Sequence, residues 1–124
     1  MGDPARRRHT LAAAFGYAFE GLAAAWRTQR NVRIQAAITL VVAAGGVLLR
    51  FSAVSWAVIA LAIALVVTAE LANTAMEAIV DLVSPEDHPL AKRAKDVAAA
   101  GVLVATLGAV AAGICVLVRT FSGP

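Results

Sequence analysis

The sequence contains a single cysteine, Cys115, and this scarcity excludes an intrachain disulfide. Cys115 lies in an apolar segment, where a small packing residue is the ordinary interpretation. Charged residues are also scarce, at 15% of the 124 residues, whereas 60% are hydrophobic and the mean hydropathy is +0.78. This balance indicates a small integral membrane protein of one domain rather than a soluble domain. Such a chain has too few helices to enclose a large cavity, so we expect an oligomer.

The usual nucleotide-binding motifs are missing as well. Neither G-x-x-x-x-G-K-[ST] nor G-x-G-x-x-G occurs in the sequence. The glycine pair Gly45-Gly46 falls at the far end of the first expected membrane span, on the opposite side of the membrane from any plausible phosphate. Residue spacing alone therefore does not identify a nucleotide.

Basic residues are distributed unevenly, although the net charge is only +3. Three membrane spans with a cytoplasmic N-terminus would put most Lys and Arg residues on the inner side, as membrane topology favours. Only Arg50 and Arg119 would then lie outside. The inner side would hold Arg6, Arg7, Arg8, Arg27, Arg30, Arg33, Lys92, Arg93 and Lys95. Because these charges flank membrane spans, we predict this topology and no nucleic-acid partner.

An N-terminal amphipathic helix on the membrane surface is expected over residues 10–28, where apolar residues recur at helical spacing. These residues are Leu11, Phe15, Phe19, Leu22 and Trp26. A signal peptide is the alternative, because three arginines precede an apolar stretch and Ala23-Ala24-Ala25 resembles a cleavage site. We prefer the surface helix because Glu20 interrupts the apolar region.

An all-α membrane protein is the predicted fold class, with three transmembrane helices over residues 32–50, 53–83 and 93–119. The first is short, because Ala36 to Leu49 supplies only about 21 Å of uncharged helix. Arg50-Phe51-Ser52 is expected to form a tight outer turn. The second span should stop before Pro85, whose ring disfavours a helical residue in front of it.

A file of four polar side chains begins where the second apolar run ends. No residue from Phe51 to Ala69 is charged, and Glu70 follows directly. The file consists of Glu70, Asn73, Glu77 and Asp81, which share one helix face within roughly 60° of arc. Glu70 lies about 28 Å along the helix from Phe51, close to the full hydrocarbon thickness. We therefore expect the file at the inner interface, where a carboxylate beside hydrocarbon is usually functional.

Other polar residues are expected at the same depth, and together with the file they would form one layer at the cytoplasmic face. They are Gln29, Arg33, Gln35, Lys95 and Asp96. Transporter sites tend to lie at the membrane midplane, so this layer favours chemistry at the interface.

The carboxylates of the file suggest a division of roles. Glu70 is deeper and less hydrated, which suits a general base that takes a proton from an alcohol. Glu77 is nearer water and suits a divalent cation that also binds water and phosphate oxygens, as Mg²⁺ prefers. Asn73 can orient either carboxylate, and Lys95 can meet phosphate oxygens as a point charge. The simpler interpretation is that Glu77 and Asp81 are solvated residues where the helix leaves the membrane.

The sequence closely resembles the signature of the prokaryotic diacylglycerol kinase family in the stretch ELANTAMEAIVDLVSPEDHPLAKRAKD, residues 70–96. The family pattern reads E-x-x-N-[ST]-A-x-E-x-x-[VI]-D, then a loop with His, then A-K-D. The similarity covers nearly the whole chain, including GYAFEGLAAAWRTQRN before the first span. The segments HPLAKRAKDVAAAG and RTQRN are more similar to the undecaprenol kinase branch than to the diacylglycerol branch.

This resemblance implies a homotrimer in the bacterial inner membrane that uses MgATP to phosphorylate a lipid hydroxyl. The implied acceptor is undecaprenol, with diacylglycerol as the alternative. By position, Glu70 matches the catalytic base and, with Asn73 and Gln35, is expected to contact the lipid. Glu77 matches a metal-binding glutamate. The implied ATP-binding residues are Tyr17, Glu77, Glu86, Asp87, His88, Lys95 and Asp96.

One position departs from the family pattern. Where the family commonly has a second metal-binding glutamate, in T-E-R-N, this chain has Gln29. An amide carbonyl can bind Mg²⁺ but brings no charge. We therefore expect weaker metal binding, or a metal held mainly by Glu77 and the ATP phosphates.

Two non-enzymatic interpretations compete with a kinase. A small transporter would also place carboxylates in a helix bundle, but should show proton-coupled flux without lipid-dependent ATP consumption. A scaffold or holin-like protein would explain three spans and basic flanks, but not the aligned polar file from Glu70 to Asp81.

Overall fold

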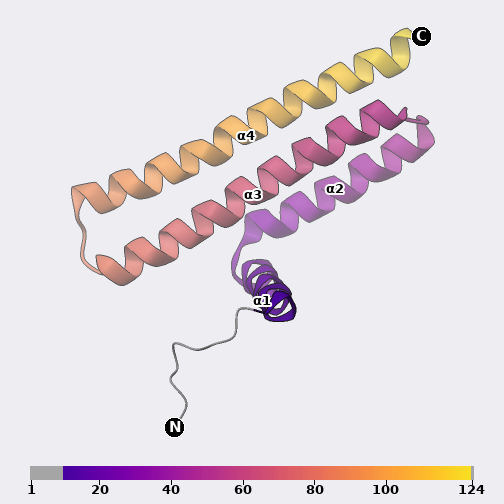
Figure 1. Ribbon diagram of the computed structural model, residues 1–124. Helices are drawn as coiled ribbons and strands as arrows, with labels where there is room; N and C mark the ends of the chain where they lie inside the picture. The colour runs from indigo at the N-terminus through magenta and orange to yellow at the C-terminus, as the bar shows by residue number, and fades with distance from the viewer. Residues whose placement is uncertain (1–9, 124) are drawn as a thin grey trace.

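The computed structural model describes residues 10–123, which form four α-helices and no strand (Figure 1). The helices are α1 (Leu11–Thr28), α2 (Arg30–Leu48), α3 (Ala53–Val83) and α4 (Pro89–Ser122). The last three are long and apolar enough to cross a membrane. The predicted all-α fold with three membrane-length helices is therefore confirmed. Three basic residues that we assigned to the inner side, Arg6, Arg7 and Arg8, lie outside the described residues.

Helix α1 lies across the direction of the other three helices (Figure 1). Thr10 caps it, because the threonine side chain accepts a hydrogen bond from the Ala13 amide at 3.2 Å. The apolar residues expected along this helix are all exposed, from 45% for Leu22 to 76% for Leu11. Helix α1 therefore has an apolar face that the described part of the chain leaves uncovered.

A sharp elbow at Gln29 separates α1 from α2. The Gln29 backbone is extended, with φ −111° and ψ 112°, so the helix cannot continue through it. Arg33 closes the elbow, because its Nη1 donates to the carbonyl oxygens of Trp26 at 2.7 Å and Arg27 at 3.3 Å. These carbonyls belong to the last turn of α1, where no following helical N–H group is available to donate to them. The guanidinium therefore stabilises both the end of α1 and the direction of α2.

A tight turn reverses the chain between α2 and α3. Arg50 adopts φ 55°, in the left-handed region that costs a non-glycine residue about 1–2 kcal/mol. Phe51 and Trp56 pack edge to face with ring centroids 5.5 Å apart. Both rings cover Gly46, where a Cβ would lie 2.6 Å from the Trp56 ring. Only glycine fits there, so this cluster fixes the α2–α3 hairpin.

The two longest helices, α3 and α4, run side by side and make most of the contacts between helices in residues 10–123 (Figure 1). Pro85 follows the end of α3, and Pro89 occupies the first turn of α4. His88 caps α4, because its Nδ1 accepts from the Leu90 amide at 3.1 Å. Helix α4 thus begins inside the polar loop, ahead of the span expected from residue 93.

Few side chains are buried within the described chain. The buried apolar residues are Ala25, Ile59, Ala105 and Val116. Two polar residues are equally buried, Ser55 and Glu70, each 2% exposed. Large apolar side chains remain exposed along α2, α3 and α4. These exposed apolar faces require lipid or further protein to cover them. Glu70 is the one charged residue among the buried residues of the described chain.

Candidate active site

The buried carboxylate of Glu70 lies on α3 against the start of α2. Its Oε1 accepts a hydrogen bond from Asn31 Nδ2 at 3.2 Å. Its Oε2 is buried and has no hydrogen-bond partner among residues 10–123. The elbow at Gln29 makes this contact possible. It starts α2 at Arg30, so that the first turn of α2, which contains Asn31, packs on α3. The result is a carboxylate with one oxygen held by Asn31 and one oxygen that accepts no hydrogen bond from residues 10–123.

One turn further along α3, Asn73 and Glu77 form a second polar contact. Asn73 Nδ2 donates to Glu77 Oε1 at 3.2 Å. Asn73 Oδ1 is buried and accepts no hydrogen bond within the described part of the chain. Asn73 therefore orients Glu77, as the spacing predicts, and still offers an acceptor next to Glu70.

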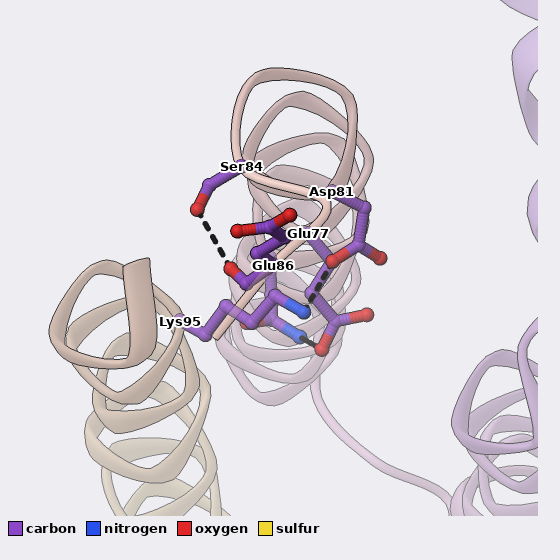
Figure 2. Close-up of polar contacts among 6 residues, drawn as sticks. Glu77, Asp81, Ser84, Glu86 and Lys95 are labelled. Carbon is purple, nitrogen blue, oxygen red and sulfur yellow. Dashed lines mark hydrogen bonds and ion pairs between the residues drawn. The ribbon is translucent and has the colours of Figure 1, made fainter. Parts of the chain in front are cut away.

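A pocket of about 740 Å³ lies where α3, the following loop and α4 meet. Its charged or titratable lining residues are Asp81, Glu86, Asp87, His88, Lys92 and Lys95. The loop is held in shape by Ser84 Oγ, which donates to the Glu86 carbonyl oxygen at 3.0 Å (Figure 2). Four of the residues that we predicted to bind nucleotide are thus brought together by one loop and one helix turn: Glu86, Asp87, His88 and Lys95.

Lys95 extends from α4 across to α3, where its ammonium forms an ion pair with Asp81 Oδ1 (Figure 2). Asp81 is one turn beyond Glu77 on the same face of α3, so the polar file ends at this pair. The sequence left open whether Asp81 is simply solvated. Its side chain is exposed, yet it is paired with the lysine expected to meet phosphates.

Four other residues predicted to bind the nucleotide or a metal are not in the lining of this pocket. The first is Glu77, which is held by Asn73 on α3. Tyr17 is on α1 and is 48% exposed. Gln29 is the half-buried residue of the elbow. Asp96 is exposed on α4, where it pairs with the pocket residue Lys92 at 2.6 Å. Their assignments to nucleotide or metal remain predictions.

An apolar groove of about 340 Å³ runs between α2, α3 and α4, and Gln35 lies in its lining. The Gln35 Oε1 atom is buried and lacks a hydrogen-bond partner in residues 10–123. Thr39 and Thr106 also line the groove, but their hydroxyls donate to carbonyls of their own helices. Three buried acceptor atoms, one each from Gln35, Glu70 and Asn73, therefore have no hydrogen-bond donor among residues 10–123.

The described residues contain no group of three or more His, Cys, Asp or Glu side chains that could hold a metal by themselves. A cation at Glu77 would therefore need further oxygen ligands, from an amide such as that of Gln29, from water or from phosphate. Mg²⁺ is usually bound in this way, by one or two carboxylates together with substrate phosphates. The donor set fits Mg²⁺ that arrives with a nucleotide.

Two partners in this site were missed in the sequence. Asn31 was not assigned a role, although it belongs to the quoted segment RTQRN. The pairing of Asp81 with Lys95 was not expected either, although both residues lie in the family signature. In both cases the only signal in the sequence was the position of the residues within the family motif. The residues adjacent to Asn31 and to Asp81 do not reveal that their partners are Glu70 and Lys95.

Comparison with known proteins gives a consistent result. The family model "Prokaryotic diacylglycerol kinase" matches residues 16–117. A diacylglycerol kinase from Synechocystis is 45% identical over 108 residues, which cover 86% of this chain and 62% of that protein. An undecaprenol kinase from Bacillus subtilis is 42% identical, with 73% of each chain covered. A diacylglycerol kinase from Escherichia coli is 35% identical, with 78% of this chain and 80% of that protein covered.

Proposed function

The chain belongs to the prokaryotic diacylglycerol kinase family, and from this premise we propose that it is a membrane lipid kinase. It transfers the γ-phosphoryl group of ATP to the hydroxyl of a lipid alcohol. The named relatives are kinases of diacylglycerol or undecaprenol, which supports an alcohol acceptor on a lipid. The transporter and scaffold alternatives gain no support from these relatives.

The free carboxylate oxygen of Glu70 is the observation that carries this proposal. Asn31 holds Oε1, whereas Oε2 has no partner in the described chain. A lipid hydroxyl that donates to Oε2 would be activated by a general base at hydrogen-bond distance. Glu70 then takes the hydroxyl proton while the lipid oxygen bonds to the γ-phosphorus and the bond to the ADP oxygen breaks.

The pocket at the α3–α4 end is the proposed nucleotide site. Lys95 supplies positive charge for phosphate oxygens, and the loop residues Glu86, Asp87 and His88 line the opening. Tyr17 and Asp96 are further proposed contacts that would join the site from α1 and from α4. Because phosphoryl transfer depends on positioning and charge stabilisation, a lysine fixed beside the polar file supports this assignment.

Carboxylates outnumber lysines around that pocket, which supports a nucleotide that arrives with a cation. Glu77, with Gln29 as an uncharged second ligand, would hold Mg²⁺. When bound, this ion supplies charge that offsets the negative phosphate oxygens. Asn73 orients Glu77 for that purpose through its amide hydrogen bond.

We further propose that the lipid lies along the groove beside Gln35, with its hydroxyl toward Asn73 and Glu70. The groove is mostly apolar, as a hydrocarbon chain requires. Undecaprenol is our proposed acceptor because HPLAKRAKDVAAAG and RTQRN are most similar to that branch. Diacylglycerol is the alternative, and relatives with either name are similarly close.

In the proposed arrangement the N-terminus and the polar layer face the cytoplasm and α1 lies on the inner membrane surface. The exposed apolar residues of α1 support contact with lipid. The exposed faces of α2, α3 and α4 support assembly with further copies, for which we propose a homotrimer.

The test is phosphoryl transfer from radiolabelled ATP in mixed micelles, with undecaprenol and diacylglycerol compared side by side and with EDTA as the metal-free control. Labelled lipid that requires both a lipid alcohol and Mg²⁺ is the expected result. Proton-coupled flux in vesicles without lipid-dependent ATP consumption would instead identify a transporter. The ratio of kcat/KM for the two alcohols decides between the acceptors.

A further inference from the structure

Among the described residues, only one ion pair joins two helices, that of Lys95 on α4 with Asp81 on α3 (Figure 2). The other pair, Lys92 with Asp96, lies within α4. Both lysines line the same pocket. The Lys92 side chain is 78% exposed, whereas that of Lys95 is 38% exposed. The ion pair with Asp81 therefore explains why the Lys95 side chain extends from α4 across the pocket toward α3.

A second carboxylate of α3 lies close to the same lysine. Glu77 precedes Asp81 by one helical turn, and side chains at this spacing are neighbours. Glu77 is held by the amide of Asn73 rather than by the lysine. The ammonium of Lys95 is thus paired with Asp81, and Glu77 attracts the same ammonium electrostatically without forming an ion pair with it.

We propose that Asp81 is a positioning residue that keeps Lys95 in the pocket and away from Glu77. The inference rests on the proposed function, which assigns Lys95 to the nucleotide phosphates and Glu77 to the cation. An ammonium has three N–H donors, so Lys95 can keep one on Asp81 and turn the others to phosphate oxygens. Without Asp81, Lys95 would pair with Glu77, and each residue would be withdrawn from its role.

A purely structural clasp between α3 and α4 is the competing explanation of this ion pair. The Asp81 side chain is 65% exposed, and exposed ion pairs contribute little to stability. A structural role therefore predicts little effect on activity when the charge is removed. A positioning role predicts a large effect on the use of ATP, because misplacing a catalytic group by about 1 Å can lower the rate about 100-fold.

The first experiment measures kcat and the KM values for MgATP and for lipid with the full chain in mixed micelles. Asp81→Asn keeps the side-chain size and removes the charge. We expect its KM for MgATP to rise about tenfold with a lower kcat, while the KM for lipid is unchanged. Asp81→Glu should recover most of this loss, because it restores the carboxylate. Arg93→Gln removes a charge from the same turn of α4 and should match the wild type.

A charge swap separates position from pairing, and it applies even where Asp81→Asn alone does not fold. The variant with Asp81→Lys and Lys95→Asp keeps an ion pair but moves the cation from α4 to α3. We expect thermal unfolding in micelles to match the wild type while activity falls as far as in Lys95→Met. Restored activity in the swap would identify a structural clasp and overturn the inference.

The outcomes also separate this inference from the function on which it rests. A wild-type protein that phosphorylates no lipid with ATP overturns the proposed function, and the inference with it. An active wild type whose Asp81→Asn variant keeps the same KM for MgATP overturns the inference alone.

Discussion

Asn31 donates a hydrogen bond to Glu70, from Nδ2 to Oε1 over 3.2 Å, and thereby connects the start of α2 to the buried carboxylate of α3. The two residues are 39 positions apart in the sequence. Their contact depends on the elbow at Gln29, which sets where α2 begins. A substitution in the first turn of α2 can therefore alter the position of Glu70, the candidate base, without changing Glu70 itself.

Glu70→Gln should abolish most activity and leave the protein folded. The amide oxygen of Gln can still accept from Asn31, so the buried contact survives, but an amide cannot take the hydroxyl proton. We expect kcat for lipid phosphorylation to fall about 10²–10⁴-fold, the usual contribution of a general base. Radiolabelled transfer measures the loss, and thermal unfolding in micelles measures the fold. Glu20→Gln, an exposed carboxylate of α1, is the matched control. Near-normal turnover of Glu70→Gln would reject Glu70 as the base.

Asn31→Ala should lower kcat and spare the KM for MgATP. The substitution leaves both Glu70 oxygens without a donor from the described chain, while alanine preserves the helix. Hydrogen bonds to charged groups contribute about 1.5–3 kcal/mol, so we expect kcat to fall about 10–100-fold. Steady-state kinetics with both substrates varied makes the measurement. Arg30→Ala changes the exposed neighbouring residue and should have no effect; an equal loss there would point to helix α2 as a whole rather than to Asn31.

The helices could be predicted from sequence because their signals are local. The uncharged run from Phe51 to Ala69 indicates a membrane-length helix, and Ser52 caps α3 by accepting from the Ser55 amide at 3.2 Å. The register of the polar file on α3 also follows from helical spacing, which brings Asn73 onto Glu77.

The contacts between helices could not be predicted in the same way. Asn31 meets Glu70 and Asp81 meets Lys95 only after α2 and α4 pack on α3. Helical periodicity assigns a residue to a face of its own helix, but it carries no information on which neighbour covers that face.

Gly46→Ala should destabilise the α2–α3 hairpin, and Gly45→Ala should not. A Cβ at residue 46 would lie 2.6 Å from the Trp56 ring, whereas nothing lies within 4 Å of a Cβ at residue 45. Forcing a methyl group into packed rings costs about 1–3 kcal/mol. At residue 45 alanine gains helix propensity of about 1 kcal/mol over glycine. Thermal unfolding in micelles should therefore order the proteins as Gly45→Ala at or above the wild type and Gly46→Ala below it. Equal stability of the two variants would contradict the packing role of Gly46.

Gln29→Glu should lower the Mg²⁺ concentration that gives half-maximal activity. Gln29 makes no side-chain cap hydrogen bond within residues 10–123, so the substitution leaves the elbow intact and changes only the charge of the proposed second ligand. Because affinity for hard cations rises with the number of charged ligands, we expect a decrease of about three- to tenfold. Gln29→Ala should shift the requirement the other way if the amide carbonyl binds the ion. An unchanged requirement in both variants would exclude residue 29 from the metal site and leave Glu77 and the nucleotide phosphates as its ligands.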